Sequence, residues 1–77
     1  MADRNELQAL QAALRGAVAM TAALTRISDR IMALAPEADI DAEEFEELAR
    51  VTLAHAVSSQ ALRGLVEAMR RRRESGA

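Results

Sequence analysis

The stretch APEADIDAEEFEEL, residues 35 to 48, contains the only proline of the 77-residue chain. A proline disfavours helical geometry at the residue before it and has no backbone N–H to donate, so a helix that approaches Pro36 ends there. Asp41 with Glu44 three residues later has the spacing of a capping box, which starts a new helix. The stretch therefore predicts a short connection between two helices.

The same residues resemble the last third of an EF-hand calcium loop, where a carboxylate-rich segment leads into the exit helix. Asp41 and Glu44 match two of its ligand positions. The rest of the loop does not match, because Ala33 and Ala35 stand at the first two carboxylate positions and Ala38 at the glycine turn. Helix capping alone explains the matching residues. We expect no calcium binding, and no metal or cofactor of any kind.

Heptad spacing extends to both sides of this connection. A first helix is predicted over about 3–35, with Asp3 as its N-cap. Its core stripe is expected at Leu7, Leu10, Leu14, Ala17, Thr21, Leu24, Ser28 and Ile31. A second helix is predicted over about 42–73. Its core stripe is expected at Leu48, Val51, His55, Ser58, Leu62, Leu65 and Met69, with Phe45 and Val66 beside it.

These elements predict an all-α protein, in which two long antiparallel helices form an αα-hairpin. The tip is expected at 36–41, a flexible C-terminus at 74–77, and a single domain over 1–77. Folding the chain about the tip sets Thr21 level with His55. Such a hairpin has a narrow core, and the chain has no cysteine and one aromatic residue to reinforce it. We therefore expect self-association into a helical bundle, most simply a four-helix-bundle dimer.

Small residues form a second stripe on each predicted helix. Its members, which we expect at the oligomer interface, are Ala9, Ala12, Gly16, Ala19 and Ala23, and then Ala54, Val57, Ala61, Gly64 and Ala68. A glycine inside a helix costs about 1 kcal/mol relative to alanine, a cost that the close approach of another backbone offsets. The alternative is that alanine is abundant here as the best helix former.

Polar residues interrupt the predicted core in its middle. Thr21, His55 and Ser58 are expected to form a polar core layer, with His55 bonded to a hydroxyl or a backbone carbonyl. A single histidine is too few ligands for zinc, and no carboxylate falls at its level to orient it for catalysis. The alternative role of this layer is to fix register and subunit number, which would make assembly sensitive to acid.

Charge is segregated at the two ends of the predicted hairpin. Seven carboxylates and no basic residue lie from residue 37 to residue 47, whereas four consecutive arginines lie near the C-terminus. The helix macrodipole explains part of both clusters. A partner-binding acidic tip is predicted at Glu37, Asp39, Glu43, Glu46 and Glu47, and a basic end at Arg70, Arg71, Arg72 and Arg73. The two ends suit antiparallel association or contact with another partner.

We expect a non-catalytic, homo-oligomeric helical-hairpin interaction module: an adaptor, a chaperone-like protein or a small regulator or inhibitor that binds another protein. Secretion chaperones, small regulators and phage-encoded inhibitors share this architecture. The alternative is an oligomeric subunit of a nucleic-acid-handling assembly that uses the arginine cluster. A ring of such hairpins resembles the oligomerisation core of phage small terminases. A net charge of −2 and the lack of aromatic residues among the arginines make nucleic acid the weaker expectation.

The amino-terminal segment MADRNEL is charged, and no apolar run approaches the roughly 18 residues that suggest a membrane span. We therefore expect no signal peptide, no contact with a membrane and a cytoplasmic location. No motif of an enzyme active site occurs, so we expect no catalysis.

Overall fold

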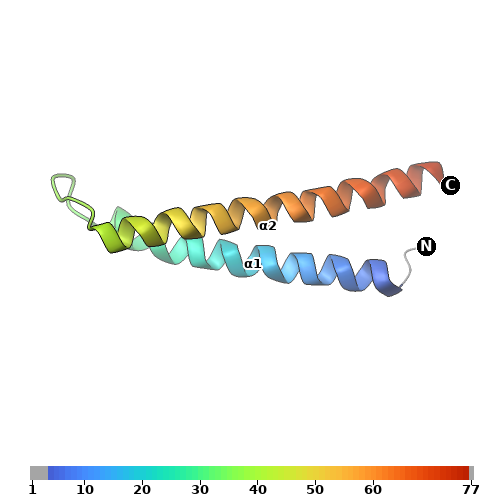
Figure 1. Ribbon diagram of the computed structural model, residues 1–77, viewed down its shortest axis with the longest axis horizontal. Coiled ribbons are helices and arrows are strands. Elements are labelled where there is room, and N and C mark those ends of the chain that lie inside the picture. Colours follow the sequence, from blue (N-terminus) through green and yellow to red (C-terminus); the bar gives the residue numbers. More distant parts are fainter. Residues whose placement is uncertain (1–3, 77) are drawn as a thin grey trace.

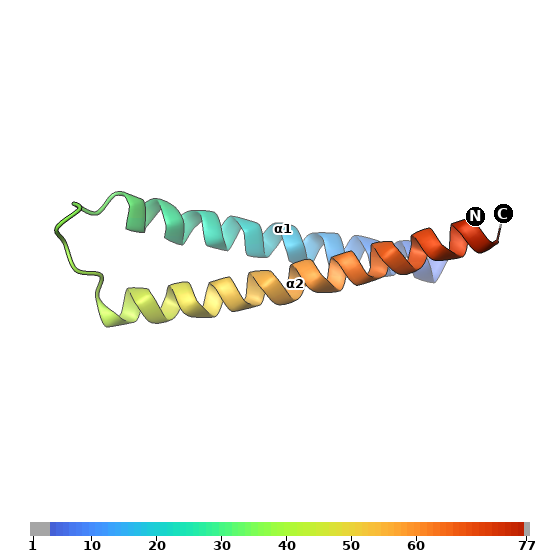
Figure 2. The same cartoon turned by 90° about the horizontal axis from the view of Figure 1, so that it is seen from above.

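A computed structural model describes residues 4–76, which form two α-helices, α1 (Arg4–Met32) and α2 (Ala42–Ser75). The helices pack against each other and run antiparallel, side by side in both views (Figures 1 and 2). The molecule is a rod of 58 × 18 × 17 Å with the connecting segment at one end. The predicted all-α hairpin is confirmed. The predicted N-cap, Asp3, lies outside the described residues.

The end of α1 comes at Met32, earlier than the predicted end near residue 35. The N–H of Leu34 donates to the carbonyl of Ile31 at 3.1 Å, a three-residue step that tightens and closes the helix. Pro36 then biases the preceding residue away from helical geometry. The connecting segment therefore spans 33–41 and is longer than the predicted tip.

The start of α2 depends on Asp41, as predicted. Its backbone is extended, with φ −76° and ψ 160°, and its side chain accepts a hydrogen bond of 2.8 Å from the N–H of Glu44. The carboxylate of Glu44 does not complete a capping box, because it accepts from Arg30 Nε at 3.1 Å. Ile40 precedes the cap and Phe45 follows it with the spacing of a hydrophobic staple, but the two residues stay 37% and 53% exposed. The N-terminus of α2 is therefore capped by the hydrogen bond between the Asp41 side chain and the N–H of Glu44.

The end of α2 lies at Ser75, beyond the predicted end near residue 73. Part of the segment predicted to be flexible, residues 74 and 75, is therefore helical. The hydroxyl of Ser75 donates to the carbonyl of Arg71 at 2.6 Å, and the N–H of Gly76 donates to the carbonyl of Arg72 at 2.8 Å. The bond from Gly76 satisfies one of the last four carbonyls of the helix, and the hydroxyl of Ser75 adds a second bond one residue earlier.

The seam between the helices differs from the prediction on α1. Thr21 and two of the predicted core leucines, Leu7 and Leu14, are exposed, so their placement in the seam is wrong. The other five predicted residues are half-buried, as expected: Leu10, Ala17, Leu24, Ser28 and Ile31. Ala13, Met20 and Ile27 join them in the seam. This rotation puts the apolar Met20 and Ile27 in the seam in place of the hydroxyl of Thr21, which favours it energetically.

On α2 the predicted stripe lies in the seam, since all seven of its members are buried or half-buried. The predicted register is also confirmed. Thr21 Oγ1 lies 3.4 Å from His55 Nε2 in the middle of the rod, and Arg72 pairs with Glu6 at 3.0 Å near its far end.

The hairpin exposes far more surface than a compact protein of its mass. Its accessible surface is 6103 Å², whereas a folded monomer of 8.3 kDa has about 4,600 Å². Its radius of gyration is 17.4 Å, against about 11.5 Å for a compact domain of this length. Among residues 4–76 only Ile27 and Met69 are buried. The core of a single chain is therefore very small.

Candidate interaction surfaces

A row of large apolar side chains lies outside the seam on one broad face of the hairpin. We call it the Leu face, and its members are Leu7, Leu14, Val18 and Met32 of α1 and Phe45 and Val66 of α2. Their side chains are between 44% and 74% exposed. At about 100° per residue, most of them project roughly 100° around their helix from the seam. On antiparallel helices the same sense of rotation from the seam leads to the same face, so both rows share it.

A notch opens near the chain ends, beside Val66 of the Leu face and along the seam. It has a volume of about 250 Å³ and is lined by Leu10 of α1 and by Val66, Met69, Arg70 and Arg73 of α2. Its lining is almost entirely apolar, so the two arginines contribute mainly the aliphatic parts of their side chains. A notch of this composition suits an apolar side chain that is accompanied by negative charge.

The predicted interface of small residues lies on the opposite face, which we call the small face. Its members project roughly 100° from the seam in the other sense, and Val57 at its centre is 59% exposed. A β-carbon at Gly64 would meet nothing within 4 Å, whereas one at Gly16 would lie 3.9 Å from Ser58 Oγ. Gly16 therefore borders the seam inside the hairpin, and Gly64 faces outward.

The predicted polar core layer is partly assembled. His55 and Ser58 are half-buried in the seam, and Thr21 is exposed at its edge, where its hydroxyl oxygen lies 3.4 Å from the imidazole of His55. Thr25 adds a hydroxyl that donates to the carbonyl of Thr21 at 2.9 Å. Within residues 4–76 no three His, Cys, Asp or Glu side chains are arranged to hold a metal ion.

The acidic tip is partly neutralised by one arginine of the other helix. Arg30 of α1 bridges Glu44 at 3.1 Å and Glu47 at 2.8 Å. The hydrogen bond to Glu44, followed by that to Glu47, raises the pKa of Arg30 above its ordinary value. Arg30 was missed because it lies 14 and 17 residues before its partners in the chain.

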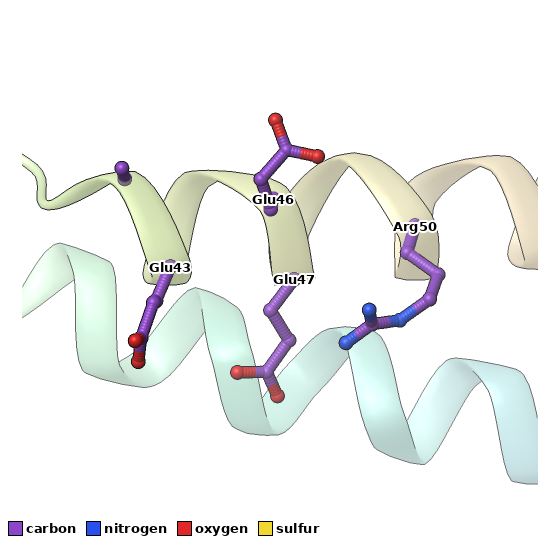
Figure 3. A pocket seen from close by; sticks show the side chains of 5 residues that line it. Glu43, Glu46, Glu47 and Arg50 are labelled. Atoms are coloured by element: carbon purple, nitrogen blue, oxygen red, sulfur yellow. The ribbon is translucent and has the colours of Figure 1, made fainter.

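Figure 3 shows an open hollow along the first turns of α2, at the acidic tip. It has a volume of about 440 Å³ and is lined by Ala42, Glu43, Glu46, Glu47 and Arg50. The side chains of Glu43, Glu47 and Arg50 extend toward the α1 side in this view, whereas Glu46 points away from it. Glu46 is therefore the carboxylate of this group that is directed most plainly toward solvent. The remaining predicted tip residues, Glu37 and Asp39, are exposed in the connecting segment.

The basic end is also partly engaged within the chain. Arg70 pairs with Glu67 at 3.3 Å and Arg72 with Glu6 at 3.0 Å. Arg70 and Arg73 border the notch, beside Val66 of the Leu face. Consecutive residues of a helix lie about 100° apart, so the four arginines point to different sides of the end of α2.

Comparison of the chain with protein-family models, curated proteins and solved structures finds no match. Neither α1 nor α2, which cover most of residues 4–76, contains a segment both long and apolar enough to cross a membrane. Function must therefore be argued from the surfaces of the hairpin.

Proposed function

We propose that this chain is a non-catalytic, homo-oligomeric interaction module in which two hairpins form a four-helix bundle. The observation that carries the proposal is the Leu face. A hairpin that buries Ile27 and Met69 alone among its described residues leaves the six large side chains of that face in water. Large apolar side chains gathered on one face of a soluble rod favour a protein interface there.

The area supports a dimer of ordinary size. The excess over a compact monomer of the same mass is about 1,500 Å² per chain. A stable protein–protein interface needs about 800 Å² from each partner, and obligate homodimers bury more. Pairing the Leu faces of two hairpins therefore suffices to remove much of this excess. It also gives each chain a core that one chain alone does not have.

Two faces compete for the role of interface. The small face offers mainly alanine and glycine, which give up little apolar area, whereas the Leu face offers leucine, valine, methionine and phenylalanine. We therefore place the dimer interface on the Leu face. The small face and the acidic tip then remain available to another protein, in keeping with an adaptor, a chaperone-like protein or a small regulator.

An oligomeric subunit of a nucleic-acid-handling assembly remains the second candidate. The consecutive arginines Arg70 to Arg73 favour it, but Arg70 and Arg72 already pair with glutamates of the same chain. Because counterion release from phosphates drives such binding, affinity for a DNA duplex would fall steeply with salt. Tight binding at physiological salt that is lost when all four arginines become serine would favour this candidate.

The thermal unfolding midpoint tests self-association. If folding is coupled to dimerisation, the midpoint measured by circular dichroism rises with protein concentration, because mass action favours the assembled state. We expect a steady rise between micromolar and millimolar protein. A midpoint that is constant over this range, with a fully helical spectrum, would show that one chain folds alone and would contradict the proposal.

A further inference from the structure

We propose that two hairpins pair tip to base, and that Phe45 of each copy enters the notch of the other. The notch is the one lined by Leu10, Val66, Met69, Arg70 and Arg73. This inference rests on the proposed dimer and adds to it the orientation of the two copies and the side chain that anchors them.

Symmetry leaves two ways to bring the Leu faces together. A two-fold axis along the rod places tip beside tip, and an axis across the rod places the tip of each copy beside the base of the other. Both bury the same face. The buried apolar area is therefore the same in both arrangements. The arrangements differ in the charges that they bring together.

The charges favour the tip-to-base pairing. Seven carboxylates lie from residue 37 to residue 47, and Arg70 to Arg73 lie at the opposite end of the rod. Tip beside tip would bring two acidic clusters together and two arginine clusters together, which costs free energy. Tip beside base sets each acidic cluster against an arginine cluster of the partner. Arg30 compensates only part of the acidic charge, since it pairs with Glu44 and Glu47.

The spacing of Phe45 and Val66 fits the same arrangement. They lie 21 residues apart, which is three heptads, so a supercoiled α2 presents both to one neighbour. Suppose that the two α2 helices run antiparallel and that the two-fold axis crosses them beside Ala56. Phe45 of each copy then lies opposite Val66 of the other. The contacts between these ends come from small or polar residues, Ala49, Thr52, Ala56 and Ser59, all of them exposed in the single chain.

The hairpin register extends this pairing to α1. Because Thr21 is level with His55, the two-fold axis that passes beside Ala56 of α2 passes beside Thr21 of α1. Leu7 of one copy then lies opposite Leu34 of the other, next to Met32. Leu34 is 39% exposed and Met32 is 74% exposed in the single chain. Large apolar side chains therefore meet at both ends of the bundle on both helices.

The notch suits a phenyl ring in size and in chemistry. Its volume is about 250 Å³, whereas a cavity of about 150 Å³ already holds benzene. Arg70 and Arg73 line it with their aliphatic stems, and a guanidinium folded over a seated ring would add a cation–π contact. The position of the two-fold axis that sets Phe45 opposite Val66 also sets Arg70 opposite Asp41 of the partner. Phe45 is the only aromatic residue of the chain and is 53% exposed.

Distances between spin labels test the arrangement. The chain has no cysteine, so Glu37→Cys labels the tip alone and Glu74→Cys labels the base alone. In a tip-to-base dimer, pulsed dipolar spectroscopy of either variant alone should give a distance close to the 58 Å length of the rod. A mixture of the two variants should add a distance well below half of that length.

Other outcomes separate this inference from the proposed function. A short distance in the Glu37→Cys sample alone, with a dimeric mass, would overturn the tip-to-base pairing and leave the proposed dimer intact. No dipolar coupling, with the mass of one chain by light scattering, would overturn both. Rising salt should weaken the tip-to-base dimer, because it screens attraction between the ends. Strengthening of the dimer by salt would contradict the pairing.

Phe45→Ala tests the anchor, with Leu53→Ala as its control. Leu53 is 67% exposed on α2 and projects away from the seam rather than toward the notch of a partner. We expect Phe45→Ala to raise the dissociation constant of the dimer roughly 30-fold or more, as for an interface hot spot, and Leu53→Ala to change it little. Equal effects of the two substitutions would show that Phe45 does not enter the notch.

Discussion

Val18→Glu is expected to convert the dimer to single chains. Val18 is 67% exposed in the hairpin, so a glutamate there costs an isolated chain little, and glutamate is the better helix former. On the Leu face of a dimer the same glutamate would be buried near the two-fold axis without a partner, once in each copy. Burying an unpaired charge costs several kcal/mol. Light scattering of the variant should therefore give half the parental mass.

Val57→Glu is the matched control for this prediction. Val57 is 59% exposed, lies on α2 and belongs to the small face, so the substitution adds the same charge to the opposite side of the rod. We expect it to keep the parental mass. If Val57→Glu dissociates the assembly and Val18→Glu does not, the stripe of alanine and glycine is the interface and the Leu face is not.

Ile27→Ala is expected to cause the largest loss of stability within the hairpin. Ile27 is 1% exposed, and no other described side chain is as deeply buried. Truncation of a buried isoleucine to alanine costs about 2–5 kcal/mol, through lost transfer free energy and the cavity that remains. A small domain has only about 5 kcal/mol in total. The variant should be largely unfolded at concentrations where the parent is helical.

Ile27→Val tests whether lost packing explains the loss of stability in Ile27→Ala. It removes one methylene group and should cost about 0.5–1.5 kcal/mol in the free energy of unfolding, measured by urea denaturation. Ile31→Ala, at a half-buried position one turn further along the same seam, should lie between the two. If Ile27→Ala and Ile31→Ala unfold at the same urea concentration, Ile27 is not the centre of the core.

The sequence predicted the architecture well, because strong local determinants specify it. Pro36 ends one helix, and the side chain of Asp41 caps the next through the N–H of Glu44. The pairing of Thr21 with His55 also followed, since a short connection between two helices leaves little freedom of register.

The choice of seam residues on α1 was not predictable from spacing alone. This helix carries two apolar stripes that share Leu10 and Leu24, one continued by Leu7 and Leu14 and the other by Ile27. The leucine stripe is the more regular in the sequence. Packing against α2 selected the stripe with Ile27, because the other brings Thr21 into the core at a cost in desolvation. The leucines left outside became the Leu face.

The charged ends show a second limit of reading the sequence. The run of carboxylates from residue 37 to residue 47 contains no basic residue, and from it we predicted a partner-binding acidic tip. The hairpin brings Arg30 to Glu44 and Glu47, a contact between helices that the order of residues does not reveal. In the same way Arg72 meets Glu6 across the base of the rod. Which charges of one helix neutralise those of the other therefore depends on how the two helices pack.

The mass of the parent chain in solution tests the central claim most directly. Size-exclusion chromatography coupled to multi-angle light scattering, at tens of micromolar protein and physiological salt, is expected to give twice the 8.3 kDa mass of one chain. The helical content should match the hairpin. A mass of one chain at that concentration, with the helices fully formed, would contradict the claim that the Leu face is covered by a second copy.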